Sequence, residues 1–282
     1  MRWNSRLKYV FLLPAVVWVL GFTIFPLLYS LRLSFFNVSF AQGNTFVGWA
    51  NFARAFSDPN VWNATRVTLT FVFVGVTVQL ILGLLFALLF NRNLPGRSVL
   101  RTIMTLPLFA TPVGVGFLFI TIFSEEGGFI RAVLGTRIPW RSNPDWALVS
   151  VISADVWNWT PFVFIVLLAA LQGIPEEYYE AARLESSSPW ELFRYITLPI
   201  LQPTIVLVIV LRLAEAFKVF DIPFSLTNGG PGNSTETFTM LTYNTYRRFF
   251  DFGYGSALAY LLLLAVAIIV TTFFSRIRQA YT

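Results

Sequence analysis

The sequence predicts an all-α, polytopic membrane protein, and three observations support this fold class. Of its 282 residues, 56% are hydrophobic and only 12% are charged, which is too apolar for the surface of a soluble domain. Stretches without a charged residue recur along the chain and reach the ~20 residues that a helix needs to cross a bilayer. Basic residues gather at the ends of these stretches. We therefore expect a single transmembrane domain over residues 1–282 with six spanning helices.

The six expected spans differ in how polar they are. Four of them contain no charged residue: 9–31, 67–91, 102–124 and 254–275. The other two, 146–172 and 197–220, are interrupted by charged side chains. Prolines also fall in or at the ends of spans, at positions 14, 26, 107, 112 and 161. Neighbouring helices must satisfy the carbonyls that each proline frees, so kinked helices are expected.

The basic residues predict the orientation of the chain. Arg2, Arg6 and Lys8 precede the first span, and three arginines lie in the short loop 91–101. Cytoplasmic loops carry an excess of lysine and arginine, so both segments are expected in the cytoplasm. An even number of spans then places the C-terminus there as well. The net charge of +6 is thus explained by basic residues that set the orientation of the spans, so no nucleic-acid partner is predicted.

Residue types that are absent narrow the chemistry. The chain contains no cysteine and no histidine, which excludes thiolate, imidazole and the usual metal sites. It also lacks the glycine-rich G-x-x-x-x-G-K-[ST] phosphate loop, so it is not itself an ATPase. No enzyme activity, bound metal or cofactor is predicted for this chain.

Two segments between spans have a recognisable character. Residues 46–71 alternate aromatic and polar side chains, which fits either a short helix at the outer surface or a packed loop with tryptophan anchors at the headgroups. The loop 221–259 contains Asn228-Gly229-Gly230-Pro231-Gly232, a strong turn signal. Residues 235–250 contain no helix breaker, so a helix or re-entrant segment is expected there.

The segment 174–199 predicts two short helices joined by a tight turn. Pro175 suits a first helical position and two glutamates follow it, so a helix is expected from Pro175 to about Glu185. Ser188 has a glutamate three residues later, as in a capping box, which predicts a second short helix from Ser188 until Pro199. Such a pair either docks on a partner protein or lies on headgroups or on the chain's own loops. Its acidic side chains favour a protein, since the inner leaflet is anionic.

The same segment resembles a known family. Glu180-Ala181-Ala182, then Glu185, Trp190, Phe193, Ile196 and Leu198-Pro199 closely resemble the cytoplasmic EAA loop of permease subunits in bacterial ABC importers. Further matches are similar to the carbohydrate branch, of the maltose, glycerol-phosphate and trehalose type; they comprise Phe46-Val47-Gly48 through Asn51-Phe52, residues 217–221, residues 227–232 and residues 235–237. One departure is Ser186, where the family usually has a glycine that tolerates positive φ.

The resemblance implies a permease subunit that forms half of a sugar translocation pathway in the bacterial inner membrane. Its expected partners are a second homologous permease, two ATPase subunits that hold ATP and magnesium, an extracytoplasmic sugar-binding protein, the sugar and membrane lipid. ATPase coupling is expected at Glu180, Ala181, Ala182, Glu185, Ser186, Trp190, Phe193 and Pro199. The turn Asn228 to Gly232 is expected to face the binding protein.

Candidate sugar contacts come from polar residues inside spans. Asp155 lies mid-span beside Trp157, Asn158 and Trp159, and an ionisable group at that depth must face a cavity or a partner. Carboxylate, amide and indole groups together suit a sugar, although a buried hydrogen bond between helices is the alternative. Glu215 is a second candidate, or it is neutralised by Arg212 and Lys218, which lie three residues away on either side.

Two other functions compete with this one. A stand-alone secondary transporter or channel predicts inverted repeats and a carboxylate pair near the midplane, and the sequence has neither feature by inspection. An intramembrane enzyme needs a nucleophile and a base, and only carboxylate or serine–lysine schemes remain without histidine and cysteine. Both are less favoured than the importer subunit.

Overall fold

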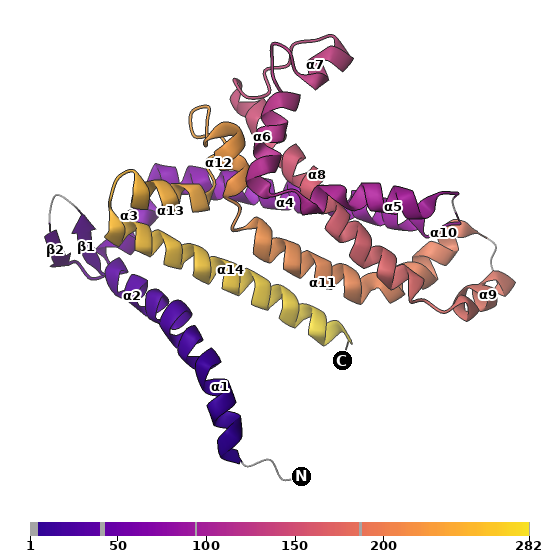
Figure 1. The fold of residues 1–282 in the computed structure, drawn as a ribbon, viewed down its shortest axis with the longest axis horizontal. Helices are drawn as coiled ribbons and strands as arrows, with labels where there is room; N and C mark the ends of the chain where they lie inside the picture. Colours follow the sequence, from indigo (N-terminus) through magenta and orange to yellow (C-terminus); the bar gives the residue numbers. More distant parts are fainter. Residues whose placement is uncertain (1–4, 40–42, 94, 186–187, 282) are drawn as a thin grey trace. The chain divides into compact units, whose positions relative to one another are not determined.

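The computed structural model of the protein describes residues 5–39, 43–93, 95–185 and 188–281 (Figure 1). The chain divides into two compact units. Unit 1 comprises residues 1–62 and 241–265, and unit 2 comprises residues 63–240 and 266–282. A single domain over the whole chain stays a prediction.

The described residues confirm a mostly helical chain with five or six candidate spans. Five helices are long and apolar enough to cross a membrane: Phe11–Ser34, Pro59–Phe90, Pro144–Gln172, Pro189–Ala216 and Phe252–Thr272. A sixth span exists only if the bent pair Arg97–Phe109 and Pro112–Ile122 counts as one. The expected spans at 9–31, 67–91, 146–172, 197–220 and 254–275 each overlap one of the five helices.

The expected span over residues 102–124 corresponds to a sharply bent pair of helices, and the kink expected at its prolines is confirmed. The segment forms α5 (Arg97–Thr105), a 3₁₀ turn η2 (Leu106–Phe109) and α6 (Pro112–Ile122), with a bend of 103°. Two prolines explain the break, because Pro107 and Pro112 lack the backbone N–H that a continuous helix would need. The Thr111 side chain then accepts a hydrogen bond from Gly114 N and caps the new helix.

Unit 1 contains a β-hairpin that an all-α expectation missed. It follows α1 (Ser5–Val19), the π-helical turn η1 (Leu20–Ile24) and α2 (Phe25–Ser34). Strand β1 (Phe36–Ser39) pairs antiparallel with β2 (Gly43–Phe46). The Asn51 amide donates to Ser34 O at 2.9 Å and to Phe36 O at 3.0 Å. These bonds fix the end of α2 and the start of the hairpin on α3 (Ala50–Ser57). A short helix within residues 46–71 is thus confirmed.

A polar cluster in unit 1 joins α3 to the start of α14 (Phe252–Tyr281). Arg54 Nη1 lies 2.8 Å from Asp251 Oδ2, and the guanidinium stacks 3.9 Å from the centre of the Tyr254 ring. The Tyr254 hydroxyl donates to Asp58 Oδ2 at 2.9 Å. These contacts position the N-terminal end of α14 relative to α3.

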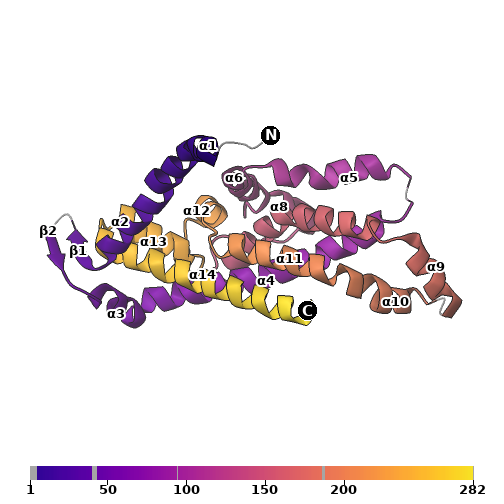
Figure 2. The ribbon, with the colours of Figure 1, turned by 90° about the horizontal axis from the view of Figure 1, so that it is seen from below.

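Unit 2 is built on α4 (Pro59–Phe90), α8 (Pro144–Gln172) and α11 (Leu198–Ala216). Figure 2 shows α8 and α11 running side by side. A glycine lets α4 approach α8 closely, because a Cβ on Gly83 would lie 2.5 Å from Val163 Cγ1. One apolar cluster near this contact includes Ala87, Phe90, Phe164, Leu167 and Leu201. A second one includes Phe71, Val115, Phe119, Leu213 and Leu226.

Short elements extend the other end of unit 2, where α12 (Asp221–Thr227) packs beside α6. The loop between α6 and α8 contains α7 (Phe129–Leu134) and is held at Glu125. Ser142 Oγ donates to Glu125 Oε2 at 2.9 Å, and the backbone N–H groups of Arg141 and Ser142 donate to Oε1. Burial alone would raise the pKa of Glu125, but these hydrogen bonds and the charge of Arg137 outweigh it, so the pKa lies below its usual value.

The helix expected within residues 235–250 is confirmed as α13 (Phe238–Arg247). The first of the two helices expected in 174–199 is also confirmed, as α9 (Glu176–Glu185). The second does not end before Pro199. It begins as α10 (Pro189–Leu192), passes through a π-helical turn η3 (Phe193–Thr197) and continues into α11.

Proline at position 199 is compatible with this continuous helix because it lies in the first turn of α11, directly after the wider π-helical turn. Inside a continuous helix its missing N–H removes one intrahelical hydrogen bond, and this irregularity falls next to the π-helical turn, where the helix is already widened. The expectation that Pro199 separates a short helix from the span is therefore wrong.

Candidate functional site

A buried polar cluster joins the three long helices of unit 2. We define the Asp155–Arg212 cluster as Gln79 from α4, Asp155 and Trp159 from α8, and Arg212 from α11. Arg212 Nη2 lies 3.2 Å from Asp155 Oδ2, and Arg212 Nε donates to Gln79 Oε1 at 2.8 Å. Gln79 Nε2 in turn donates to Asp155 Oδ2 at 2.7 Å. Each of these three side chains therefore contacts the other two.

The cluster neutralises charges that would otherwise be costly at this depth. Asp155 is 3% exposed and Arg212 is 1% exposed. The Arg212 guanidinium also lies 4.3 Å from the centre of the Trp159 ring, which adds a cation–π contact in a site with little water. Removing one partner of such a pair leaves an uncompensated buried charge. Asp155 therefore forms the buried bonds between helices that were expected as the alternative to a sugar contact.

A small cavity borders this cluster. Its volume is about 180 Å³, and its wall combines charged, aromatic and apolar groups: Pro112, Asp155, Trp159, Arg212, Glu215, Ala216, Lys218, Val219, Phe220, Asp221 and Ile222. Arg212 Nη1 is buried and has no hydrogen-bond partner among the described residues. A buried donor of this kind is stabilised by an acceptor oxygen. The cavity therefore offers donors, acceptors and an indole ring within one small space.

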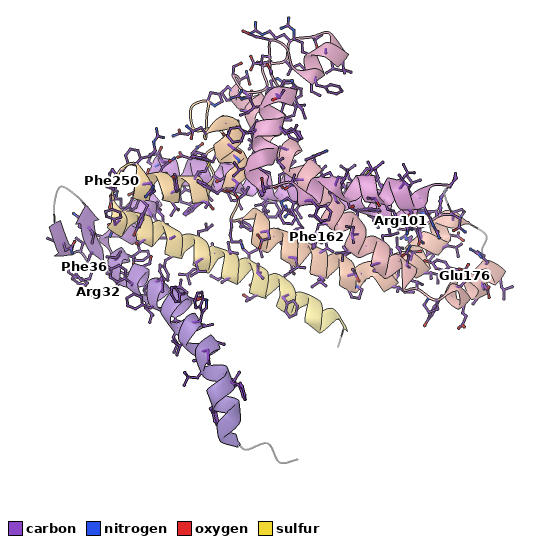
Figure 3. All side chains as sticks on the ribbon, in the orientation of Figure 1. Arg32, Phe36, Arg101, Phe162, Glu176 and Phe250 are labelled. Carbon is purple, nitrogen blue, oxygen red and sulfur yellow. The ribbon has the colours of Figure 1, made fainter. Side chains whose placement is uncertain are left out.

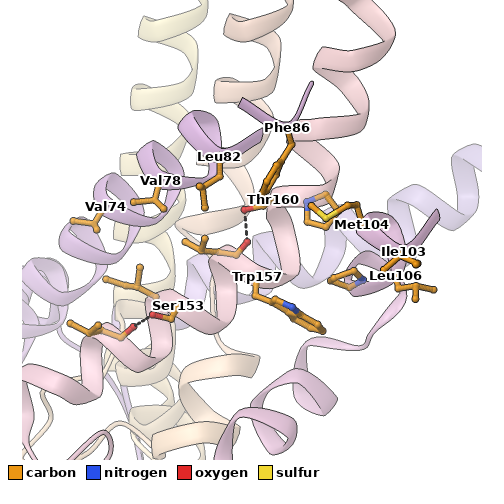
Figure 4. A pocket seen from close by; sticks show the side chains of 15 residues that line it. Val74, Val78, Leu82, Phe86, Ile103, Met104, Leu106, Ser153, Trp157 and Thr160 are labelled. Atoms are coloured by element: carbon orange, nitrogen blue, oxygen red, sulfur yellow. Dashed lines mark hydrogen bonds between the residues drawn. The ribbon is translucent and has the colours of Figure 1, made fainter. Parts of the chain in front are cut away.

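A larger cavity of about 830 Å³ lies between α4, α5 and α8 (Figure 4). Its lining is mostly aliphatic and aromatic, with Val74, Leu82, Met104 and Trp157 among the side chains. The hydroxyls of Ser153 and Thr160 donate to carbonyls of their own helix. Because the wall is apolar, this cavity suits hydrocarbon better than a hydroxylated solute. The smaller cavity is the better candidate for polar chemistry despite its size.

The structure separates the residues that the sequence grouped together. Asp155 and Glu215 line the smaller cavity, whereas Trp157 lines the larger one. Asn158 is buried, and its amide donates to Pro107 O at 2.7 Å, which joins α8 to the bend of the broken span. Glu215 pairs with Lys218 at 2.9 Å. A shared contact of Asp155, Trp157 and Asn158 with one solute stays a prediction.

Sequence analysis did not identify Gln79, and it weighed Arg212 only as a partner of Glu215. Gln79 had a usable signal, as a polar residue in the middle of the apolar stretch 67–91. The pairing of Arg212 with Asp155 had no signal in the sequence, because the two residues are 57 positions apart along the chain. Only the packing of α8 against α11 brings the two charges together.

The helix pair consists of α9 and α10 (Pro189–Leu192) with the turn that follows α10. Large apolar side chains are exposed on it, although the segment is rich in acidic residues. Leu184 is 90% exposed, Trp190 is 65% exposed and Tyr195 is 66% exposed. Glu180 and Ala181 are exposed on α9, and Ala182 is half-buried. Large apolar side chains grouped at a surface mark a protein-binding site or a membrane contact.

A side-chain contact joins α9 to the π-helical turn η3, directly before α11. The Tyr179 hydroxyl lies 3.1 Å from Thr197 Oγ1, and the Trp190 and Phe193 rings lie 5.7 Å apart. An open hollow of about 560 Å³ is lined by Pro175, Glu177, Tyr178, Ala181, Ala182 and Ile196. Glu185 ends α9. Ser186 lies outside the described residues, so the prediction about its turn stays untested.

The glycine-rich turn is built as its sequence predicts. Asn228 has φ 50°, Gly229 has φ 82° and Gly232 has φ 58°, all in the left-handed region that glycine and asparagine tolerate. Thr235 N donates to Gly229 O at 3.1 Å, and Thr235 Oγ1 donates to Gly230 O at 3.0 Å. These bonds close the loop through Pro231 and give it a defined shape.

Comparison with known proteins gives a consistent match. Residues 79–279 match the model of the family described as "Binding-protein-dependent transport system inner membrane component". The chain is 37% identical over 268 residues to the trehalose/maltose transport system permease protein MalF of Thermococcus litoralis, covering 93% of this chain and 90% of that protein. It is 32% identical over 272 residues to the lactose transport system permease protein LacF of Rhizobium radiobacter, covering 93% and 90%.

Solved structures agree with these relatives. The chain superposes with a TM-score of 0.86 and 25% identity on a chain of a bacterial ABC transporter involved in the import of the acidic polysaccharide alginate, covering 98% of this chain and 96% of that chain. A second structure is of that kind of transporter in complex with an alginate pentasaccharide-bound periplasmic protein. It matches with a TM-score of 0.83 and 25% identity, covering 95% and 93%.

Proposed function

We propose that this chain forms half of the sugar pathway of an importer, beside a second, homologous permease. The chain belongs to the family of binding-protein-dependent transport system inner membrane components and is the permease subunit of an ABC sugar importer. It works with ATPase subunits and a periplasmic binding protein, as ABC importers do. ATP and magnesium bind to two such ATPase subunits, and this chain is not an ATPase. Lipid surrounds its spans, and both termini face the cytoplasm.

We place the sugar subsite of this permease in the 180 Å³ cavity beside the Asp155–Arg212 cluster. Arg212 Nη1 supplies a buried donor, and Trp159 supplies an aromatic ring. Glu215 and Lys218 supply polar groups at the same wall. The volume is below the ~300 Å³ at the lower end of typical ligand pockets. The subsite therefore holds one part of a sugar, and the second permease provides the rest of the contact surface.

ATPase docking is assigned to the helix pair, and one observation carries this assignment. The helix that begins at Pro189 continues without a break through α11 to Ala216, so it joins exposed Trp190 directly to Arg212 and Glu215. A displacement of the pair is therefore transmitted to the proposed sugar subsite by a single helix. We assign Glu180, Ala181, Ala182, Trp190 and Phe193 to the docking surface, together with Glu185 at the end of α9, Ser186 directly after it in the sequence, and Pro199 in the first turn of α11.

The turn from Asn228 to Gly232 is proposed to face the binding protein. Its backbone is fixed by Thr235 and by the Asn63 amide, which donates to Asn233 O at 2.9 Å. A loop of defined shape loses little entropy when a partner binds it. The turn therefore suits recognition of a rigid protein surface.

Charge reversal on α9 tests the docking proposal. In the reconstituted importer, Glu180→Lys is expected to lower sugar uptake and sugar-stimulated ATP hydrolysis together. The Glu180 carboxylate is proposed either to pair with a basic group on the ATPase or to hold the turn through backbone N–H groups, and both roles need its negative charge. Glu126→Lys is the matched control, since this exposed glutamate lies on the loop between α6 and α8. The affinity of the binding protein for sugar is expected to stay unchanged in both variants. Normal coupling in a correctly inserted Glu180→Lys complex would refute docking through this surface.

A further inference from the structure

Arg101 is an arginine of α5 whose side chain contacts the ends of two other helices. Its Nη2 donates to Phe90 O at 2.6 Å. The Gln172 side-chain oxygen, with the amide placed so that both of its polar atoms face suitable partners, accepts from Nη2 at 2.9 Å and from Nη1 at 3.3 Å. Phe90 is the last residue of α4, and Gln172 is the last residue of α8. One guanidinium therefore joins three helices.

The physical chemistry of helix ends favours this arrangement. The last carbonyls of a helix lack partners within the helix and carry the negative end of its dipole. A guanidinium satisfies both needs, because it is positively charged and presents several donors in a fixed plane. A charge-assisted bond of this kind is roughly twice as strong as a neutral one. Arg101 is also half-buried, so water competes less for its donors.

The position of this contact along the chain gives it a role in movement. Only Gly173, Ile174 and Pro175 separate Gln172 from α9. Ile174 is buried in the apolar cluster that includes Phe90, and Met104 of α5 packs against the same cluster. Figure 3 labels Arg101 and Glu176 at the same end of the unit. A displacement of α9 therefore reaches α5 through the Arg101 side chain and through this packing.

We propose that Arg101 is a positioning residue that makes α5 move with the C-terminal end of α8. The bent α5–α6 segment then follows the helix pair during transport. The proposal rests on the proposed function in one respect, namely that the helix pair is displaced by the ATPase. Helix α11 then carries the movement to one side of the small cavity. Arg101 carries it to α5 and on to α6, which ends beside α12.

Transport per ATP hydrolysed is the first readout. Arg101→Gln in the reconstituted importer is expected to lower sugar uptake per ATP by about fivefold, the size typical for loss of one coupling contact. Arg101→Lys is expected to restore part of the loss, because it keeps the charge but not the planar set of donors. Arg97→Gln is the matched control, one turn earlier on α5, where the arginine bonds to Asn93 of the loop at 2.8 Å.

A double-mutant cycle separates this contact from general damage. Arg101→Gln and Gln172→Ala are expected to be strongly non-additive in uptake per ATP, since each removes the same bond. Additive losses would overturn the proposal. So would a fall in uptake and ATP hydrolysis in equal proportion, because that pattern reports a loss of folded complex.

The second readout does not depend on ATPase docking. Spin labels on Ser98→Cys of α5 and Glu176→Cys of α9 are placed in the otherwise cysteine-free chain within the importer. With Arg101 present, one narrow distance distribution is expected both without nucleotide and with ATP. Arg101→Gln is expected to broaden it. An equally narrow distribution in the variant would overturn the role of Arg101, whereas intact coupling in Glu180→Lys would instead refute the docking proposal.

Discussion

At the scale of single residues, the polar side chains buried inside the spans are the most informative ones. Asp155 satisfies both expectations raised by its sequence position, because it is paired between helices and also borders a cavity. The same carboxylate can therefore hold α8 against α11 and shape the proposed sugar subsite. The two roles are separable, since one depends on pairing with Arg212 and the other on contact with sugar.

Substitutions at Asp155 separate these roles. Asp155→Leu leaves the Arg212 charge buried without its partner and is expected to destabilise the chain by about 3–5 kcal/mol. Adding Arg212→Met to Asp155→Leu is expected to recover most of that stability, because an apolar pair often replaces a buried ion pair without loss. Thermal unfolding of the purified protein in detergent measures both effects. Unchanged stability in Asp155→Leu would show that the pair does not hold the helices together.

The milder variant Asp155→Asn keeps an acceptor oxygen for Gln79 and Arg212. It is expected to leave the importer assembled while sugar uptake falls. Uptake at the wild-type rate in an assembled Asp155→Asn complex would exclude the charge of Asp155 from the sugar subsite.

At the scale of elements, the sequence predicts what depends on local pattern. Apolar length and the absence of charge identify the long helices, and Pro175 with two glutamates identifies α9. The turn at Asn228 follows from glycines that tolerate positive φ. Each of these features depends on neighbours within a few residues, so the chain itself contains the information.

Elements that depend on distant packing could not be predicted in this way. The hairpin beginning at Phe36 is fixed by Asn51, which lies beyond both of its strands. Prolines at positions 107 and 112 indicate a kink, but the 103° bend also depends on Asn158 of α8, which binds the Pro107 carbonyl. The pairing of Asp155 with Arg212 likewise requires that α8 and α11 be packed.

The glycine-rich turn provides a prediction at this scale. Gly229→Val is expected to distort the loop, because φ 82° is strained for valine and the new Cβ would lie 3.3 Å from Met240 Cε. Stimulation of ATP hydrolysis by sugar-loaded binding protein should then weaken. Gly230→Ala is the matched control, since its Cβ would meet nothing closer than 3.4 Å. Equal stimulation in both variants would indicate a passive hairpin.

Acid is expected to loosen the loop between α6 and α8. The folded-state pKa of Glu125 lies below its usual value, so its contribution to stability is complete above the unfolded pKa of about 4.5. That contribution is lost as the pH falls through the lower, folded value. Protection of residues 124–143 against hydrogen exchange, measured relative to the intrinsic exchange rate at each pH, should therefore fall below about pH 4.5 in the wild type, and less steeply in Glu125→Gln. An identical pH profile for both proteins would exclude Glu125 as the group that titrates.

At the scale of the whole molecule, the distribution of charge predicts the orientation of the chain. The arginines of the loop 91–101 and the basic residues near the N-terminus predict that both ends are cytoplasmic. Asn4→Cys and Gln279→Cys are therefore expected to react with an impermeant thiol reagent only after the cells are opened. Glu126→Cys, on the loop expected outside, is the positive control in intact cells. Labelling of positions 4 and 279 from outside would reverse the orientation.

Co-purification tests most directly whether the chain works as the coupled permease of an importer. The tagged chain is expressed with its neighbouring genes, solubilised in detergent and purified, and the ATPase subunits that accompany it are quantified. The wild type is expected to retain ATPase subunits together with a second permease. Glu180→Lys is expected to retain the second permease but less of the ATPase. Purification of the wild-type chain with no ATPase subunit, from membranes that contain one, would contradict this account.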